Sequence, residues 1–189
     1  MNDFEEVLGF WFGPLDEQGH ADAVHVSRWW KKDPAFDAEI RSRFGALHAT
    51  VLRGERDLWL TTPAGRLAFI LVLDQFSRNM FRDSARAFAG DGRAVEAALE
   101  GIAAGADQRL RAHERGFMYM PLMHSENLEL QDRCIELFGA AGDVGSEKFA
   151  ERHRDIIRRF GRFPHRNPVL GRPSTDDERA FLAQPGSSF

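Results

Sequence analysis

The sequence predicts an all-α fold in one domain of 189 residues. Apolar side chains return at every third or fourth position along most of the chain, as on one face of a helix, and the period-two alternation of strands hardly appears. Capping residues followed by proline open several of these segments. Turn signals divide the chain into eight or nine predicted helices with short connections.

Two short helices are predicted first. Apolar residues within 4–11 share one face, and Gly13-Pro14 ends this segment before a polar loop that extends to residue 20. Val26, Trp29 and Trp30 mark the second helix.

A capping residue followed by proline opens each of the next two helices. Asp33-Pro34 begins one that continues to Gly54, and Thr62-Pro63 begins one that continues to Met80. The helix after Thr62 is apolar on nearly every side, so we expect it to be the central, buried helix.

Two helices are predicted in the middle of the chain. One opens at Asp91-Gly92, closes at Gly105 and directs Leu99 toward the core. The other covers residues 110–118. We expect Pro121 to interrupt it, because proline has no N–H for the helical hydrogen bond.

A pair of helices follows, joined by a glycine-rich turn. The first covers residues 130–138, and the turn covers residues 139–145. Ser146 is predicted to cap the second, which buries Phe149 and His153 and ends at a left-handed Gly161.

The last predicted helix is short. Thr175 and Glu178 have the spacing of a capping box, which places the helix start at Thr175. Residues 183–189 are expected to form a flexible tail.

Charge and cysteine content narrow the class of protein. The formal net charge is −4, which opposes phosphate attraction, so nucleic acid is not an expected partner. Cys134 is the single cysteine, which excludes an intramolecular disulfide and predicts a cytoplasmic protein. The longest apolar run, Leu67–Leu73, is too short for a membrane-spanning helix of about 20 residues. No glycine-rich phosphate loop or nucleophile elbow occurs, and no cofactor is expected.

Polar residues interrupt the most apolar helix. In "LDQFSRNMFR", Asp74, Arg78 and Arg82 follow one another at a spacing of four, with Gln75 and Asn79 beside them. A buried aspartate and arginine must pair, so we expect an ion pair between Asp74 and Arg78. This pair either fixes the register of the helix or orients Arg78 toward a ligand.

A second polar group follows Pro121. In "FMYMPLMHSENL", a turn at the proline directs His124 toward a neighbour, with Glu126 close by. His124 is either a core residue with its hydrogen bonds satisfied or an acid–base group. A metal site is not expected, because His-Glu-x-x-His spacing is absent.

The densest constellation is "HRDIIRRFGRFPHRN", residues 153–167. Seven arginines lie between Arg152 and Arg172 against one acid, Asp155. His153 faces inward, and Arg154 lies on a different face. After the helix, Phe163 is expected to anchor a loop by burial. The polar residues of this loop either cradle an anion or bind helix-end carbonyls. They are Arg162, His165, Arg166 and Asn167.

Together with "VLGFWFG", "YMPLMHSE" and "LGRPST", these motifs resemble the bacterial family called domain of unknown function 924, over residues 7–182. The resemblance implies an all-helical, tetratricopeptide-like fold, in which antiparallel helix pairs stack into a curved bundle with a concave face. It implies no reaction. This chain departs from the family pattern at Ser77 and at Met123, where the family commonly has a glutamate before the motif histidine.

Two functions remain open. In the first, the polar residues line a concave pocket for a small carboxylate or phosphate, with His165 and His124 as candidate catalytic residues in proton transfer. The candidate ligand-binding residues are Asp74, Gln75, Arg78, Asn79, Arg82, Glu126, His153, Arg154, Arg162, Arg166 and Asn167. In the second, a tetratricopeptide-like scaffold clamps an acidic peptide with its arginines. The sequence predicts neither the reaction nor the oligomeric state.

Overall fold

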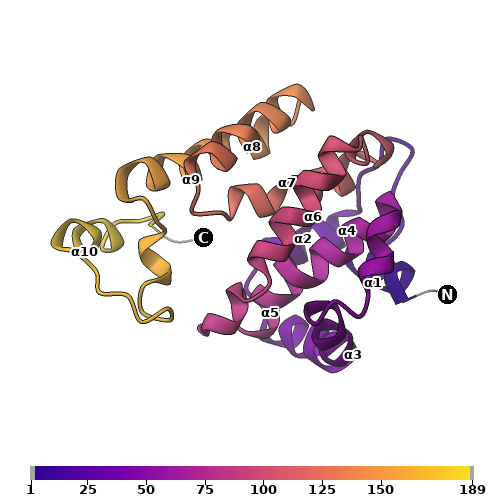
Figure 1. Cartoon of the computed structure of the whole chain (residues 1–189), viewed down its shortest axis with the longest axis horizontal. Coiled ribbons are helices and arrows are strands. Elements are labelled where there is room, and N and C mark those ends of the chain that lie inside the picture. Colours follow the sequence, from indigo (N-terminus) through magenta and orange to yellow (C-terminus); the bar gives the residue numbers. More distant parts are fainter. Residues whose placement is uncertain (1–2, 188–189) are drawn as a thin grey trace. The chain divides into compact units, whose positions relative to one another are not determined.

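A computed structural model of the chain describes residues 3–187, whose regular structure is helical (Figure 1). Within these residues there is no strand, and the one bridge joins Leu15 to Ala21. The all-α prediction is confirmed. Contacts divide the chain into two compact units. Unit 1 contains the residues up to Arg82 and Arg86–Pro121, and unit 2 contains Asp83–Ala85 and the residues from Leu122 onward.

Residues 3–187 contain nine helices when α4, the π-helical turn η2 and α5 are counted as one continuous helix. Those of unit 1 are α1 (Asp3–Phe12), α2 (Ala23–Trp29), α3 (Pro34–Leu52), α4 (Pro63–Leu71), η2 (Val72–Phe76), α5 (Ser77–Met80), α6 (Asp91–Ala103) and α7 (Ala112–Met123), whose last two residues belong to unit 2. Those of unit 2 are α8 (Leu128–Ala140), α9 (Val144–Phe160) and α10 (Asp176–Leu182). Short 3-10 turns are η1 (Asp57–Thr61), η3 (Ala85–Phe88), η4 (Asp107–Arg109) and η5 (Pro164–Arg166).

The centre of unit 1 is the continuous helix α4–η2–α5. Thr62 caps it by accepting the Gly65 N–H, at 3.1 Å, and residues 67–77 are all buried. α4 contacts α1 and α6, and α5 contacts α3. The prediction of a central, buried helix is confirmed, and so are the two cap-and-proline starts at Asp33 and Thr62.

A π-helical turn, Val72–Phe76, interrupts this helix and was not predicted. Such a turn contains one residue more than the α-helical repeat and often occurs at functional sites. All five of its residues are buried, including Asp74 and Gln75. The turn therefore places two polar side chains inside an apolar core.

α6 packs through small side chains. Its buried residues are Ala94, Ala97, Ala98 and Gly101, whereas Leu99 is exposed. The prediction that Leu99 faces the core is wrong. Gly101 shows the reason, because a Cβ there would lie 2.5 Å from Cδ of Arg66. The Arg66 side chain of α4 lies against this face of α6 and donates to the Ala97 carbonyl, at 2.7 Å, which leaves room only for small side chains.

α7 continues through Pro121 to Met123, so the predicted interruption at Pro121 is wrong. Proline removes one helical hydrogen bond, but only two residues of the helix remain after it. His124 comes directly after the end of the helix, in the turn that the sequence predicts there.

In unit 2, α8 and α9 form a helical hairpin (Figure 1). The connecting turn is shorter than predicted, and Asp143 caps α9 by accepting the N–H of Ser146, at 3.0 Å. The prediction that Ser146 is the cap is therefore wrong, because a carboxylate three residues earlier takes that role. Phe149 is 41% exposed, so its predicted burial is wrong as well, whereas His153 is buried.

The end of unit 2 follows the sequence signals. Gly161 ends α9 in the left-handed conformation, at φ 69°, and Thr175 and Glu178 form the predicted capping box of α10. Ser187 is buried and donates its hydroxyl to the Leu182 carbonyl. Residues 188–189 of the predicted tail lie outside the described residues. A tetratricopeptide-like arrangement and a single domain stay predictions.

No helix within residues 3–187 combines the length and the apolarity needed to cross a membrane.

Candidate functional site

The predicted pair of Asp74 and Arg78 is present in unit 1. An Nη1–Oδ1 distance of 2.9 Å separates the two charged groups, and Arg78 also donates to the Asp74 carbonyl. Gln75 donates to the other Asp74 oxygen, at 2.7 Å. Arg78 reaches a second acid, Asp91 at the start of α6, through two hydrogen bonds of 3.0 Å each.

The Arg78 guanidinium thus has a carboxylate on two sides. Burial by itself would lower its pKa, but the charges of Asp74 and Asp91 outweigh this effect and raise the pKa above its usual value. Arg78 therefore stays charged and links the π-helical turn to the first turn of α6. This contact with Asp91 was not predicted, because only tertiary structure places Asp91 near the helix.

Arg82 and Asn79 contact a different helix. The spacing predicted that Arg82 shares a helical face with Asp74 and Arg78. This prediction is wrong, because α5 ends at Met80 and Arg82 lies beyond the helix. Instead, its guanidinium forms two hydrogen bonds to the buried Asp37 of α3, and Asn79 donates to the same carboxylate, at 2.8 Å.

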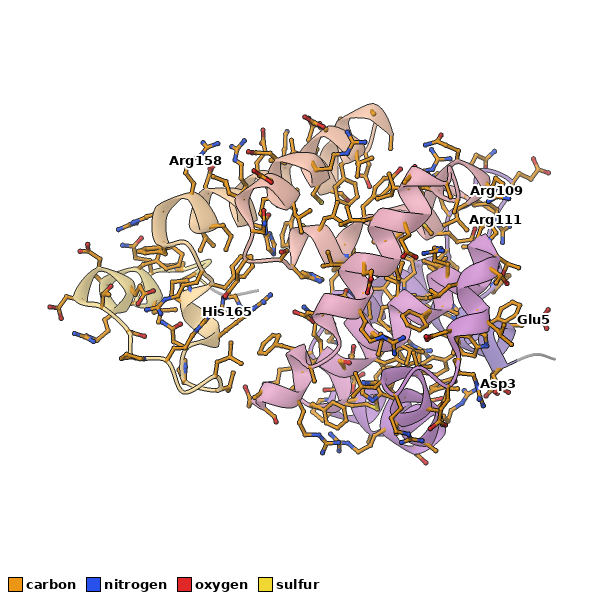
Figure 2. All side chains as sticks on the ribbon, viewed as in Figure 1. Asp3, Glu5, Arg109, Arg111, Arg158 and His165 are labelled. Carbon is orange, nitrogen blue, oxygen red and sulfur yellow. The ribbon has the colours of Figure 1, made fainter. Side chains whose placement is uncertain are left out.

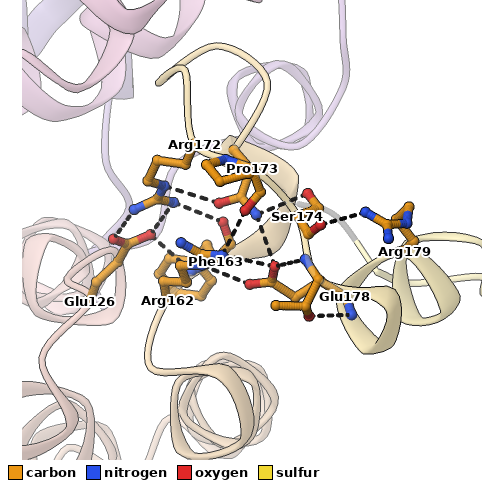
Figure 3. A network of polar contacts seen from close by, with 10 residues as sticks. Glu126, Arg162, Phe163, Arg172, Pro173, Ser174, Glu178 and Arg179 are labelled. Carbon is orange, nitrogen blue, oxygen red and sulfur yellow. Dashed lines mark hydrogen bonds and ion pairs between the residues drawn. The ribbon is translucent and has the colours of Figure 1, made fainter.

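A polar network joins the loop after α9 to the segment between α7 and α8, within unit 2 (Figure 3). Glu126 accepts from both terminal nitrogens of Arg172, at 2.6 and 2.9 Å, and from the N–H of Phe163, at 2.8 Å. Burial raises the pKa of Glu126, but the hydrogen bonds from Arg172 and Phe163 lower it by more. The net shift of the pKa is therefore downward.

Glu178 is the centre of the second half of this network (Figure 3). It accepts two hydrogen bonds from Arg162, at 2.7 and 2.9 Å, one from the Thr175 N–H, at 2.8 Å, and one from Asn167, at 3.3 Å. The bonds from Arg162 are the main cause that holds the pKa of Glu178 at about 2. Asn167 is fully buried and also accepts from Arg172, at 3.0 Å.

His153 and His165 lie beside the buried ring of Phe163, and His124 lies beside His153; we call these three histidines, with Arg166, the histidine cluster. The ring centroids of His124 and His153 are 6.3 Å apart, and those of Phe163 and His165 are 5.6 Å apart. His153 lies 5.7 Å from Phe163. The Arg166 guanidinium lies over the same phenylalanine ring, at 4.5 Å, and donates to the His124 carbonyl, at 2.9 Å.

His153 is buried and neutral within this cluster. Its Nδ1–H donates to the Phe149 carbonyl, at 2.8 Å. Burial is the main reason why its pKa falls to about 3, and the positive charges of His124, His165 and Arg166 add to the effect. His124 and His165 are half-buried.

The structure thus assigns each predicted site residue to one of two groups. Asp74, Gln75, Arg78, Asn79 and Arg82 belong to unit 1. The remaining predicted residues belong to unit 2: His124, Glu126, His153, Arg154, Arg162, His165, Arg166 and Asn167. Convergence of both groups on one pocket stays a prediction.

Chemically, most of the predicted arginines bind internal acids or carbonyls. Arg154 contacts Asp155, at 3.0 Å, and Asp132 of α8, at 3.8 Å. These contacts support the reading that they hold helix ends and loops in place. The histidine cluster, by contrast, combines several groups that bind anions or transfer protons. Within residues 3–187, no group of three or more His, Cys, Asp or Glu residues has the geometry to hold a metal ion.

Two exposed arginines of α9, Arg152 and Arg159, were not among the predicted site residues. Neither has a hydrogen bond or ion pair within residues 3–187. A sequence signal existed, because both belong to the segment from Arg152 to Arg172, in which seven arginines occur with one acid, but their lack of partners is visible only in three dimensions.

Comparisons with known proteins agree with the fold. A family model described as a bacterial protein of unknown function (DUF924) matches residues 7–186. A solved structure of a protein of unknown function from Agrobacterium tumefaciens is 38% identical, with a TM-score of 0.85, and the match covers 95% of this chain and 96% of that one. No curated protein matches the sequence.

Proposed function

The chain belongs to the DUF924 family of bacterial proteins of unknown function, and we propose that it binds a small carboxylate or phosphate at the histidine cluster of unit 2. The observation that carries the proposal is that side chains from three separate segments lie close together: two imidazoles and one guanidinium beside the Phe163 ring, and a third imidazole, that of His124, beside His153. Such groups donate hydrogen bonds to anionic oxygens, and an ionised donor strengthens each bond.

The protonation states fit this role. His153 stays neutral at physiological pH because its pKa is about 3, so it contributes hydrogen bonding without charge. Arg166 carries a fixed charge, and the half-buried His124 and His165 can each take up or release a proton. In this proposal, the same two histidines serve as acid and base if the bound anion reacts.

Phosphate and citrate titrations of the full-length protein test the proposal. We expect both anions to raise the melting temperature and to shift the imidazole NMR signals of His124 and His165, more strongly at pH 6 than at pH 8, because protonated imidazoles bind anions better. His165→Asn has no imidazole signal at position 165, so the test in this variant is the His124 signal, whose shift should be abolished while the protein remains folded.

Arg158→Gln is the matched control, since Arg158 lies on the surface of α9 (Figure 2) and its side chain is 56% exposed. This variant should bind as the parent protein does. The proposal is wrong if phosphate, citrate and sulfate all leave the imidazole signals unchanged, or if His165→Asn responds like the parent.

A further inference from the structure

We infer that α9 and α10 form a docking surface for an acidic peptide segment of a partner protein, separate from the histidine cluster. The surface consists of two neighbouring depressions of about 390 and 380 Å³, both lined by Arg159 and Phe160. We call it the α9–α10 groove. One depression continues over Arg162, Thr175, Asp177 and Glu178, and the other over Arg152, Asp155, Ile156, Phe181, Pro185 and Gly186.

Arg159 is the centre of the groove. Its guanidinium carbon lies 4.6 Å from the ring centroid of Phe160 and 5.8 Å from that of Phe181. Stacking on aromatic rings holds the guanidinium in place and leaves its N–H groups, which lie at its edge, available for hydrogen bonds. Within residues 3–187, Arg159 forms no hydrogen bond or ion pair.

Most other arginines around the groove do have a hydrogen-bond or ion-pair partner. Arg154 and Arg158 contact Asp132 and Asp155. The arginines of the following loop are held by acids or a carbonyl: Arg162 by Glu178, Arg166 by His124 and Arg172 by Glu126. Only Arg152 and Arg159 of the basic segment have no such partner among the described residues.

Charge and polarity specify the partner. Of the acids that line the groove, Asp155 is paired with Arg154, and Glu178 is paired with Arg162. Asp177 is then the only lining acid left to offset the charges of the two unpaired arginines, so positive charge is in excess. The floor between Arg152 and Arg159 is apolar, with Ile156, Phe160 and Phe181. The groove therefore favours a ligand with carboxylates at its ends and an apolar side chain between them.

Spacing favours a peptide over a small anion. Arg152 and Arg159 are seven positions apart on one helix, which is about 10.5 Å along the axis. An extended peptide covers this distance in about three residues. A segment in the polyproline II conformation, which repeats every three residues with a rise of about 3.1 Å per residue, places acidic residues three positions apart on the same side. Such a segment can contact both guanidinium groups, and an apolar residue between the acids can contact the apolar floor.

Fluorescence anisotropy with the full-length protein provides the test. The probes are labelled nonapeptides with two glutamates three positions apart and phenylalanine between them, together with matched peptides in which serine replaces phenylalanine or lysine replaces glutamate. We expect only the acidic peptide with phenylalanine to bind. Arg159→Gln should weaken its binding about tenfold or more, as for an arginine at the centre of an interface, and Arg158→Gln should leave it unchanged.

Several results would overturn the inference. They are a failure of the acidic phenylalanine peptide to bind, equal binding of the serine peptide, and binding that Arg159→Gln does not weaken. Concentration-dependent self-association in the ultracentrifuge that Arg159→Gln abolishes would identify the occupant as a second copy instead. His165→Asn should not alter peptide binding, which separates this surface from the anion site proposed above.

Discussion

At the scale of single residues, Glu178 shows how one carboxylate can hold several segments together. It is 2% exposed, and its oxygens accept hydrogen bonds from Arg162, Asn167 and the backbone of Thr175. An acid in such surroundings keeps its charge because each donor favours the ionised form. The network depends on that charge.

We predict that Glu178→Gln lowers the free energy of unfolding by about 1–3 kcal/mol, because the buried donors lose an ionised acceptor. The pKa of about 2 lies below the ordinary value of 4.5. The stabilisation is therefore fully present above pH 4.5 and is lost as the pH falls through 2. Urea unfolding as a function of pH measures both effects.

Asp176→Asn is the control for this change, because Asp176 lies on the same helix with a side chain that is 96% exposed. Its pair with Arg179 is a surface pair, and such pairs contribute little. Equal destabilisation by the two substitutions would contradict the role assigned to Glu178.

His153 gives a second residue-scale prediction, with a different pH window. Its folded pKa of about 3 lies below the ordinary 6.5, so the unfolded chain binds a proton that the folded chain excludes. The stabilisation is present above pH 6.5 and declines as the pH falls toward 3, by about 1.4 kcal/mol per pH unit. NMR should show a neutral His153 ring at pH 5, and a ring that titrates near 6.5 would refute the prediction.

At the scale of helices, two glycines should respond in opposite ways to alanine. A Cβ at Gly65, in the first turn of α4, would lie 2.4 Å from the Trp59 carbonyl oxygen, and this backbone atom cannot move aside cheaply. Gly45 lies inside α3 with nothing within 4 Å of such a Cβ.

We predict that Gly65→Ala destabilises the protein by about 1–3 kcal/mol through overpacking. Gly45→Ala should stabilise it by about 0.5–1 kcal/mol, because alanine is the better helix former. Thermal unfolding of both variants measures the difference. A stabilising Gly65→Ala would mean that η1 and α4 are not packed as described.

The helices also show what sequence can and cannot predict. Local signals predicted the starts at Asp33, Thr62 and Thr175, because a cap and its helix lie within a few residues of each other. The inward face of α6 was mispredicted, because this face consists of small residues that fit against the Arg66 side chain, whereas the prediction placed the large apolar Leu99 there. Local patterns do not contain that distance.

In the candidate site too, contacts between residues close in sequence were predictable, and contacts between residues far apart in sequence were not. The pair of Asp74 and Arg78 was predictable, because both residues lie four positions apart on one helix. Asp91 and Asp37, the other acids that hold Arg78 and Arg82, are far away in sequence, and only the tertiary fold brings them near. The inward orientation of His153 was predicted from spacing. Its approach to His124 and His165 was part of the pocket hypothesis, but no local pattern in the sequence contains it.

At the scale of the whole molecule, the buried groups with shifted pKa values are unevenly distributed between the two units. Unit 2 contains Glu126, Glu178 and His153, all of which resist protonation in the folded state. In the described part of unit 1, burial and the charge of Arg86 lower the pKa of His48, and the buried Asp74 is paired with Arg78. The pKa values of about 3 for His153 and about 2 for Glu178 both belong to unit 2, so we expect acid to destabilise unit 2 more than unit 1.

The tryptophans make this difference measurable. All four lie in unit 1, at positions 11, 29, 30 and 59, so tryptophan fluorescence reports on unit 1, whereas far-UV circular dichroism reports on the helices of both units. As the pH falls from 6.5 toward 3, we expect helicity to decrease before the fluorescence changes. His153→Phe should move the loss of helicity to lower pH without moving the fluorescence transition, since it removes one proton-linked group from unit 2. Superimposable transitions in the parent protein would show that the two units unfold together, and would contradict the separate acid response that the charge distribution predicts.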